Sequence, residues 1–220
     1  MKRKDTFRTL EAINEADPRG RDRPTLEKRH EALASITLNR AIPLPVARII
    51  ETAKNLSLYA HFVFRFHPVA QLLGYIALEV ALKEKWQASN GKPVDKDHQT
   101  LKPLLDHALE KHWITTETFK WARETAAHSA KIKKLNTLYE QLPAGGFPPP
   151  VASEEDIQKE LDSYAHWATG WAEAASDARN RSAHGDLHSL DQSEGPLRLI
   201  VEAINGMFVG NTEVTDEESS

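Results

Sequence analysis

Residues 178–188, with the sequence ARNRSAHGDLH, combine side chains that suit acid–base and phosphate chemistry. Arg179 and Asn180 are adjacent, and His184 follows after three further residues. A histidine with an ordinary pKa of about 6.5 can take or give a proton at neutral pH. An arginine can hold a phosphate through two parallel hydrogen bonds. This segment is therefore either part of an active site or a solvated helix end.

The spacing of these residues on a helix limits how they can act together. If the helix runs through residue 184, Asn180 and His184 share one face because they are four residues apart. Arg179 and His184 are five residues apart, about 140° around the helix, and so point in different directions. Gly185 is well suited to end the helix in a left-handed conformation. A site that uses both Arg179 and His184 therefore needs a helix end, a second copy of the chain, or both.

The same segment offers a weaker pattern for a metal ion. His184 and His188 are four residues apart, and Asp186 or Asp191 could add oxygen ligands. Gly185 interrupts this helix, however, and the chain has no HExxH pattern. The absence of cysteine excludes disulfides, thiol nucleophiles and cysteine-based metal centres. We therefore expect neither a metal ion nor another cofactor.

The composition is typical of a soluble globular protein. The 220 residues are 40% hydrophobic and 27% charged, which is enough for a packed core. The longest apolar stretch, residues 69–82, is shorter than the roughly 20 residues needed to cross a bilayer, and the amino terminus lacks the apolar run of a secretory signal. A net charge of -4 argues against nucleic-acid binding by the whole surface. We expect a cytoplasmic protein that does not enter a membrane.

Charge and helix-breaking residues divide the chain into three parts. Residues 1–45 are expected to form a basic arm, because bases outnumber acids near its start and prolines precede residue 46. Residues 46–210 should form a helical domain, and residues 211–220 an acidic, disordered tail. No convincing strand pattern is present. The predicted fold is all-α, a bundle of four to six helices.

Apolar residues recur at three- and four-residue steps in several stretches, which predicts helices there. These stretches are residues 46–60, 69–82, 101–113, 115–142, 157–184 and 195–210. Pro68 should kink or break the helix before the second stretch. Ser153, with Asp156 three residues later, is close to a capping box that opens the fifth helix.

The stretch at residues 69–82 is apolar nearly all round. Leu78 and Leu82 lie on the side opposite the main stripe, which consists of Val69, Leu72, Leu73, Ile76 and Val80. Such a helix is buried by neighbours on both sides or supports a dimer interface. Glu79, at the edge of the stripe, should find a cationic or hydrogen-bonding partner. We expect a homodimer to which the helix of residues 69–86 and the helix of residues 157–184 contribute.

Two further groups of residues have a structural interpretation. His61 and His67 flank aromatic residues and are expected to be buried, hydrogen-bonded histidines rather than parts of a cleft. Trp167 and Trp171, at helical spacing, are expected to make core or dimer contacts.

The motif and its context resemble the HEPN superfamily of small all-α domains. The signature of that family is an arginine, a polar residue that is often asparagine, and a histidine a few positions later. Arg179, Asn180 and His184 match this signature. An upstream apolar helix that contains an acid and a short helix after the motif extend the resemblance over about residues 46–210.

The resemblance implies a homodimer with the two motifs facing each other across a cleft and, in the active members, metal-independent cleavage of RNA. His184 would transfer protons, Arg179 would bind the phosphate and stabilise its developing charge, and Asn180 would orient His184 or the phosphate. A toxin or phage-defence role, with a cognate antitoxin or defence partner, belongs to the same expectation. Some toxin members carry a tyrosine where this chain has Asp186, an anion that would repel a phosphate unless it is paired.

Two alternatives stay open. Many HEPN domains are inactive and serve as modules for dimerisation or for binding RNA or nucleotides. In a purely structural interpretation, the cluster from Arg179 to His184 caps its helix and ties that helix to Glu79.

Overall fold

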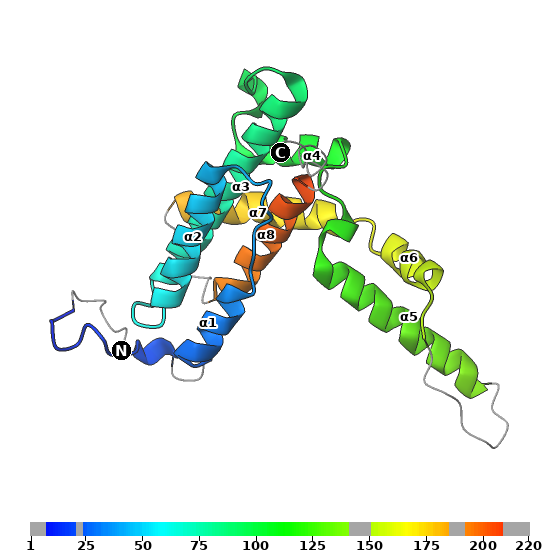
Figure 1. Cartoon of the computed structure of the whole chain (residues 1–220), viewed down its shortest axis with the longest axis horizontal. Helices are drawn as coiled ribbons and strands as arrows, with labels where there is room; N and C mark the ends of the chain where they lie inside the picture. The colour runs from blue at the N-terminus through cyan, green and yellow to red at the C-terminus, as the bar shows by residue number, and fades with distance from the viewer. Residues whose placement is uncertain (1–7, 21–23, 141–150, 185–191, 209–220) are drawn as a thin grey trace, which may run out of the picture. The chain divides into compact units, whose positions relative to one another are not determined.

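The computed structural model describes residues 8–20, 24–140, 151–184 and 192–208, and all regular structure in these ranges is helical (Figure 1). The predicted all-α class is confirmed. The predicted count of four to six helices is wrong, because the described residues contain eight α-helices. These are α1 (Leu26–Ala34), α2 (Leu44–Tyr59), α3 (Phe66–Asn90), α4 (Leu101–Glu110), α5 (Lys120–Glu140), α6 (Glu154–Ser163), α7 (Trp167–Ala183) and α8 (Glu194–Met207).

Two features account for the additional helices. One is α1, which lies in the segment expected to be an arm, and the other is a break that divides the expected helix of residues 157–184 into α6 and α7. At this break the N–H of Trp167 donates to the carbonyl of Tyr164 (2.8 Å), as in a tight turn. The hydroxyl of Thr116 donates to the same carbonyl (3.2 Å). A residue far away in the sequence thus holds the carbonyl that a continuous helix would use.

The local signals for helix ends agree with the structure. The chain breaks between α2 and α3, and Pro68 lies in the first turn of α3, where its missing N–H leaves no hydrogen bond unmade. Ser153 caps α6 through a reciprocal pair of bonds with Asp156, whose N–H donates to the Ser153 hydroxyl (3.2 Å). Both expectations are confirmed.

The chain forms two compact units. Unit 1 comprises residues 1–81 and 178–201, and unit 2 comprises residues 82–177 and 202–220. Helices α3, α7 and α8 each contribute residues to both units. Arg179, Asn180 and His184 belong to unit 1. The boundary expected at residue 46 stays a prediction, and the acidic tail lies outside the described residues.

In unit 1, α3 buries one side more deeply than the sequence pattern indicates. Leu78 is fully buried, and Gly74 lies against the buried side chains of Leu197 and Ile200 of α8. The predicted main stripe is less buried, since Val69 is 39% exposed and the stripe residues after it are mostly half-buried. This stripe of α3 therefore remains partly open to a partner.

In unit 2, α6 lies along α5, as the yellow and green helices in Figure 1 show. At the start of α5 the fully buried ring of Phe119 contacts the rings of Trp167 (4.5 Å) and Trp171 (4.9 Å). Both tryptophans are half-buried and pack on this core residue, so the expected core contacts are present. None of the described helices combines the length and the apolar character needed to cross a bilayer.

Gly206 of α8 lies where a side chain has no room, which gives a test of packing in unit 2. A Cβ atom added there would collide with Cγ2 of Thr118 and lie 3.2 Å from its Oγ1. That Oγ1 accepts a hydrogen bond from the N–H of Thr115 (2.9 Å), so the side chain cannot rotate without breaking the bond. Gly206→Ala should lower the free energy of unfolding by about 1–3 kcal/mol, measured by urea denaturation. Gly170→Ala is the control, because a Cβ on Gly170 meets nothing within 4 Å, and it should raise stability by about 0.5–1 kcal/mol. Equal effects at the two sites would contradict the packing described for Gly206.

Candidate functional site

Arg179 of α7 is tied to Glu79 of α3 within unit 1. Its Nη2 atom lies 3.2 Å from Oε2 of Glu79, and the side chains are 29% and 14% exposed. The expected cationic partner of Glu79 is therefore confirmed. The Nε atom of Arg179 is buried without a hydrogen-bond partner in the described part of the chain. Glu79 thus fixes Arg179 through one Nη atom and does not engage the whole guanidinium fork.

Asn180 and His184 lie on a face of α7 different from that of Arg179. The N–H of His184 donates to the carbonyl of Asn180 (3.1 Å), so the helical hydrogen-bond pattern reaches residue 184. The two exposed side chains therefore lie one turn apart on the same face. Arg179 is about 140° away from His184 around the axis. One copy of the chain consequently does not bring Arg179 and His184 together.

Arg181 adds a second cation to this end of α7. It is exposed, and it lies close enough to Tyr75 of α3 to affect that hydroxyl. Burial raises the pKa of Tyr75, and the charge of Arg181 partly opposes the rise. The following residues 185–191, with the expected helix end at Gly185 and the possible ligands Asp186, His188 and Asp191, lie outside the described residues.

His67 lies in a buried polar network beside a cavity. It is 1% exposed, and its ring packs edge-on against Phe64 at 5.5 Å. Nη1 of Arg29 lies 3.1 Å from Nε2, and the hydroxyl of Ser193 lies 2.8 Å from Nδ1. The expectation of a buried, hydrogen-bonded histidine is confirmed for His67. It is wrong for His61, which is half-buried and lines the cavity beside the network.

The arginine decides the proton position on His67. Because a guanidinium only donates, Nε2 of His67 must accept, and the ring proton must be on Nδ1. His67 therefore donates to Ser193 and has no free lone pair toward it. A histidine that activates a serine nucleophile instead accepts a hydrogen bond from the serine hydroxyl. The pair of His67 and Ser193 is therefore structural.

The same network joins four segments of unit 1. The hydroxyls of Ser57 in α2 and Ser193 before α8 are 2.6 Å apart. Arg29 of α1 donates to the carbonyl of Ser57 (3.3 Å) and pairs with Glu194 of α8 (3.3 Å). Sequence analysis missed these residues because they come from three segments far apart in the sequence, and no spacing signals their contact.

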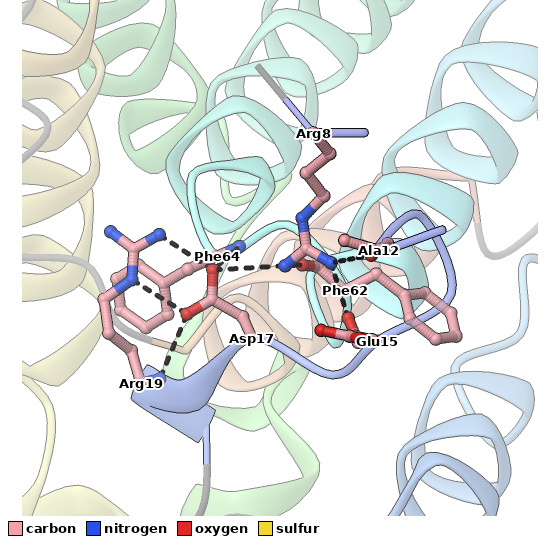
Figure 2. Close-up of polar contacts among 7 residues, drawn as sticks. All are labelled: Arg8, Ala12, Glu15, Asp17, Arg19, Phe62 and Phe64. Carbon is pink, nitrogen blue, oxygen red and sulfur yellow. Dashed lines mark hydrogen bonds and ion pairs between the residues drawn. The ribbon is translucent and has the colours of Figure 1, made fainter. Parts of the chain in front are cut away.

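Figure 2 shows a second buried charge, Asp17, with Arg8 and Arg19 approaching it from opposite sides. The carboxylate of Asp17 accepts bonds from Nε (2.9 Å) and Nη2 (2.8 Å) of Arg19 and from the N–H of Phe64 (3.3 Å). Burial would raise the pKa of Asp17, but these hydrogen bonds and the charge of Arg19 lower it to about 2. Asp17 was also missed, because Phe64 lies far from it in the sequence.

A cavity of about 530 Å³ lies beside this cluster. Its lining includes Asp17, Arg29, His61, Phe64 and His67. Asp17 is saturated by its donors and His67 by the buried network. Neither residue is therefore placed to act as a general base in this cavity.

The described residues contain no group of three or more histidines and carboxylates arranged to hold a metal ion. Comparisons of the chain with protein-family profiles, curated proteins and solved structures found no match. The end of α7 carries the exposed residues Asn180, Arg181 and His184, whose types can bind a phosphate or transfer a proton.

The Asp17 cluster predicts a pH-dependent contribution to stability. Its folded pKa of about 2 lies below the ordinary 3.8, so the carboxylate stabilises the fold above pH 3.8 and loses this effect as the pH falls toward 2. Asp17→Asn should therefore be less stable than wild type at pH 5, with the difference shrinking between about pH 4 and pH 2. Urea denaturation over this range measures the difference. Asp97→Asn, at an exposed aspartate of unit 2, is the control, and a pH-independent difference for Asp17→Asn would contradict the prediction.

Proposed function

We propose that the chain is a metal-independent endoribonuclease of toxin or defence type, whose active site forms where the α7 ends of two copies meet. The observation that carries the proposal is the exposed face of Asn180 and His184 beside an arginine that Glu79 holds in place. Cytoplasmic location, kinship with the HEPN superfamily and control by a cognate antitoxin or defence partner belong to the same proposal.

The proposed reaction is an internal transesterification of RNA. His184 of one copy takes the proton of a ribose 2′-hydroxyl, and the 2′-oxygen attacks the neighbouring phosphorus. The bond from phosphorus to the 5′-oxygen breaks, and the same His184 returns its proton to that oxygen. Arg179 of the other copy stabilises the additional negative charge on the phosphate, and Asn180 orients the histidine or the phosphate. The products are a 2′,3′-cyclic phosphate and a 5′-hydroxyl.

Glu79 serves this reaction as a positioning residue. A guanidinium held through one Nη atom keeps its direction while other donors of the fork remain for a phosphate. Without Glu79, Arg179 would lose that constraint and bind the phosphate in several orientations. The ion pair therefore supports preorganisation of the charge-stabilising group.

The partly open stripe of α3 is the proposed contact between copies. Val69 is 39% exposed and begins a row of mostly half-buried apolar side chains that leads along α3 toward Glu79. A two-fold contact through this stripe would place each Arg179 close to the partner chain. Such a contact supplies the second copy that the opposite directions of Arg179 and His184 require.

A second candidate function is a non-catalytic dimeric module that binds RNA or nucleotides. The observation that favours it is the pairing of Arg179 with Glu79, which gives the arginine a structural use without any substrate. A module of this kind would dimerise and cut nothing.

Cleavage assays distinguish the two functions. Wild type should cut single-stranded RNA in EDTA, leave 2′,3′-cyclic phosphate ends, and spare DNA because DNA lacks the 2′-hydroxyl. His184→Ala should lose roughly 10²- to 10⁴-fold in rate, and Arg179→Ala a comparable factor. The exposed residues His30 and Arg48 provide controls, because their alanine variants should keep full activity.

Thermal unfolding of the same variants completes this test. In the catalytic interpretation both variants fold as well as wild type at pH 7, apart from a modest loss when the Arg179–Glu79 pair is removed. An inactive wild type, together with an Arg179→Ala variant destabilised by on the order of 1–3 kcal/mol, would show that the cluster is structural.

The contact between copies has its own test. Light scattering at micromolar concentration should show a homodimer or a larger assembly, and Val69→Glu should reduce its mass because a charge would be buried at the contact. Leu44→Glu is the control, since Leu44 is 60% exposed elsewhere in unit 1. A monomeric wild type, or a Val69→Glu variant with unchanged mass, would contradict the proposed contact.

A further inference from the structure

One face of helix α5 packs against α6. Three ion pairs define this face, and they join Lys133 to Glu160 (2.6 Å), Lys134 to Asp156 (3.4 Å) and Arg123 to Glu154. Ala130 lies between these pairs along the helix and is buried. The direction of Ala130 therefore marks the side of α5 that α6 covers.

The opposite face of α5 carries a partly exposed row of large side chains. It consists of Trp121, Thr125, His128, Ile132 and Leu135, which recur at alternating steps of four and three residues. At 100° per residue, all five lie about 140–180° from Ala130. Trp121 is 48% exposed and Ile132 is 42% exposed. This row, called the outer stripe below, has the 3.5-residue period of a coiled-coil seam, with polar residues at its second and third positions.

We propose that the outer stripe binds the outer stripe of a second copy as an antiparallel pair of helices. In this pairing Trp121 packs on the partner's Ile132, and Thr125 packs on the partner's His128. Each larger side chain thereby meets a smaller one, and the two-fold axis repeats both contacts. Trp121 also rests against Trp167 of its own chain (5.4 Å), so little side-chain freedom is lost on binding.

The two polar residues of the stripe suit the centre of this pairing. The hydroxyl of Thr125 can donate to a ring nitrogen of the partner's His128, and the two-fold axis repeats this hydrogen bond. A polar residue in a seam specifies register, because any slip separates it from its partner and sets it against an apolar side chain. The polar centre therefore favours the register in which Trp121 meets the partner's Ile132.

Charged residues beside the outer stripe favour a second copy as the binding partner, in the antiparallel orientation. Glu124 and Lys131 are exposed on the same flank, seven residues apart. In the antiparallel pairing Glu124 faces the partner's Lys131, and Lys131 faces the partner's Glu124. A parallel pairing would place Glu124 near Ser129 and Lys131 near Asn136, with no charge pair. A slip of one heptad in the antiparallel pairing would oppose the two copies of Lys131, which disfavours that register.

This contact is independent of RNA cleavage and separate from the α3 stripe of the proposed nuclease. Two different two-fold contacts on one chain lead to an assembly larger than a dimer. Loss of the outer-stripe contact should therefore reduce the mass of the assembly, while variants of Arg179 or His184 should leave it unchanged. Failure of either proposal is thus visible without reference to the other.

Charge exchange tests the contact. Glu124→Lys and Lys131→Glu should each weaken self-association roughly tenfold or more in sedimentation equilibrium, because both attractive pairs become repulsive. An equimolar mixture of the two variants should associate again, because both charge pairs across a mixed contact then join a lysine to a glutamate. This recovery separates a contact effect from a folding defect.

Two further variants complete the experiment. Ile132→Glu should abolish the contact. Lys159→Glu is the control, because it makes the same charge change as Lys131→Glu at an exposed position of α6, and it should leave the contact unchanged. Differently tagged Glu124→Lys and Lys131→Glu chains identify the mixed species in the mixture. The proposal is overturned if neither single variant weakens association, or if the mixture associates no more strongly than its components.

Discussion

A buried arginine determines how unit 1 is arranged. Arg29 is 3% exposed, and a guanidinium can be removed from water only where fixed acceptors and a counter-charge surround it. The carbonyl of Ser57, the ring of His67 and the carboxylate of Glu194 meet this requirement. Helices α1, α2, α3 and α8 therefore hold one arrangement, because displacement of any of them leaves a buried polar group without its partner.

The candidate site depends on this arrangement through α3. Glu79 lies twelve residues beyond His67 on the same helix, about 18 Å along its axis, and there it fixes Arg179 at the end of α7. The helix continues to His184 and turns that side chain away from Arg179. In one chain the two side chains therefore point in different directions, and the proposed site requires a second copy to bring them together. The outer stripe of α5 is a separate proposed contact between copies.

The sequence predicted best the features that neighbouring residues decide. Pro68 marks the start of α3, Ser153 and Asp156 cap α6, and a charged residue in an apolar helix, Glu79, required a partner. The break between α6 and α7 could not be predicted, because the hydroxyl of Thr116 takes a carbonyl about 50 residues away along the chain. In the buried network only His67 was predicted as a buried, hydrogen-bonded residue. Its partners were not predicted, because they lie on separate segments and no spacing signals their contact. The spacing of Arg179 and His184 predicted that a continuous helix would point them in different directions, and it left a helix end or a second copy as the ways to join them.

The central claim is that Arg179 and His184 act together across two copies of the chain. Its most direct test mixes Arg179→Ala chains with His184→Ala chains, each inactive by itself, and measures RNA cleavage after subunit exchange. The claim predicts recovery of about a quarter of the wild-type rate, because half of the dimers are mixed and each mixed dimer holds one complete site of two. A mixture that stays as inactive as its components, with mixed dimers demonstrably formed, would contradict the claim.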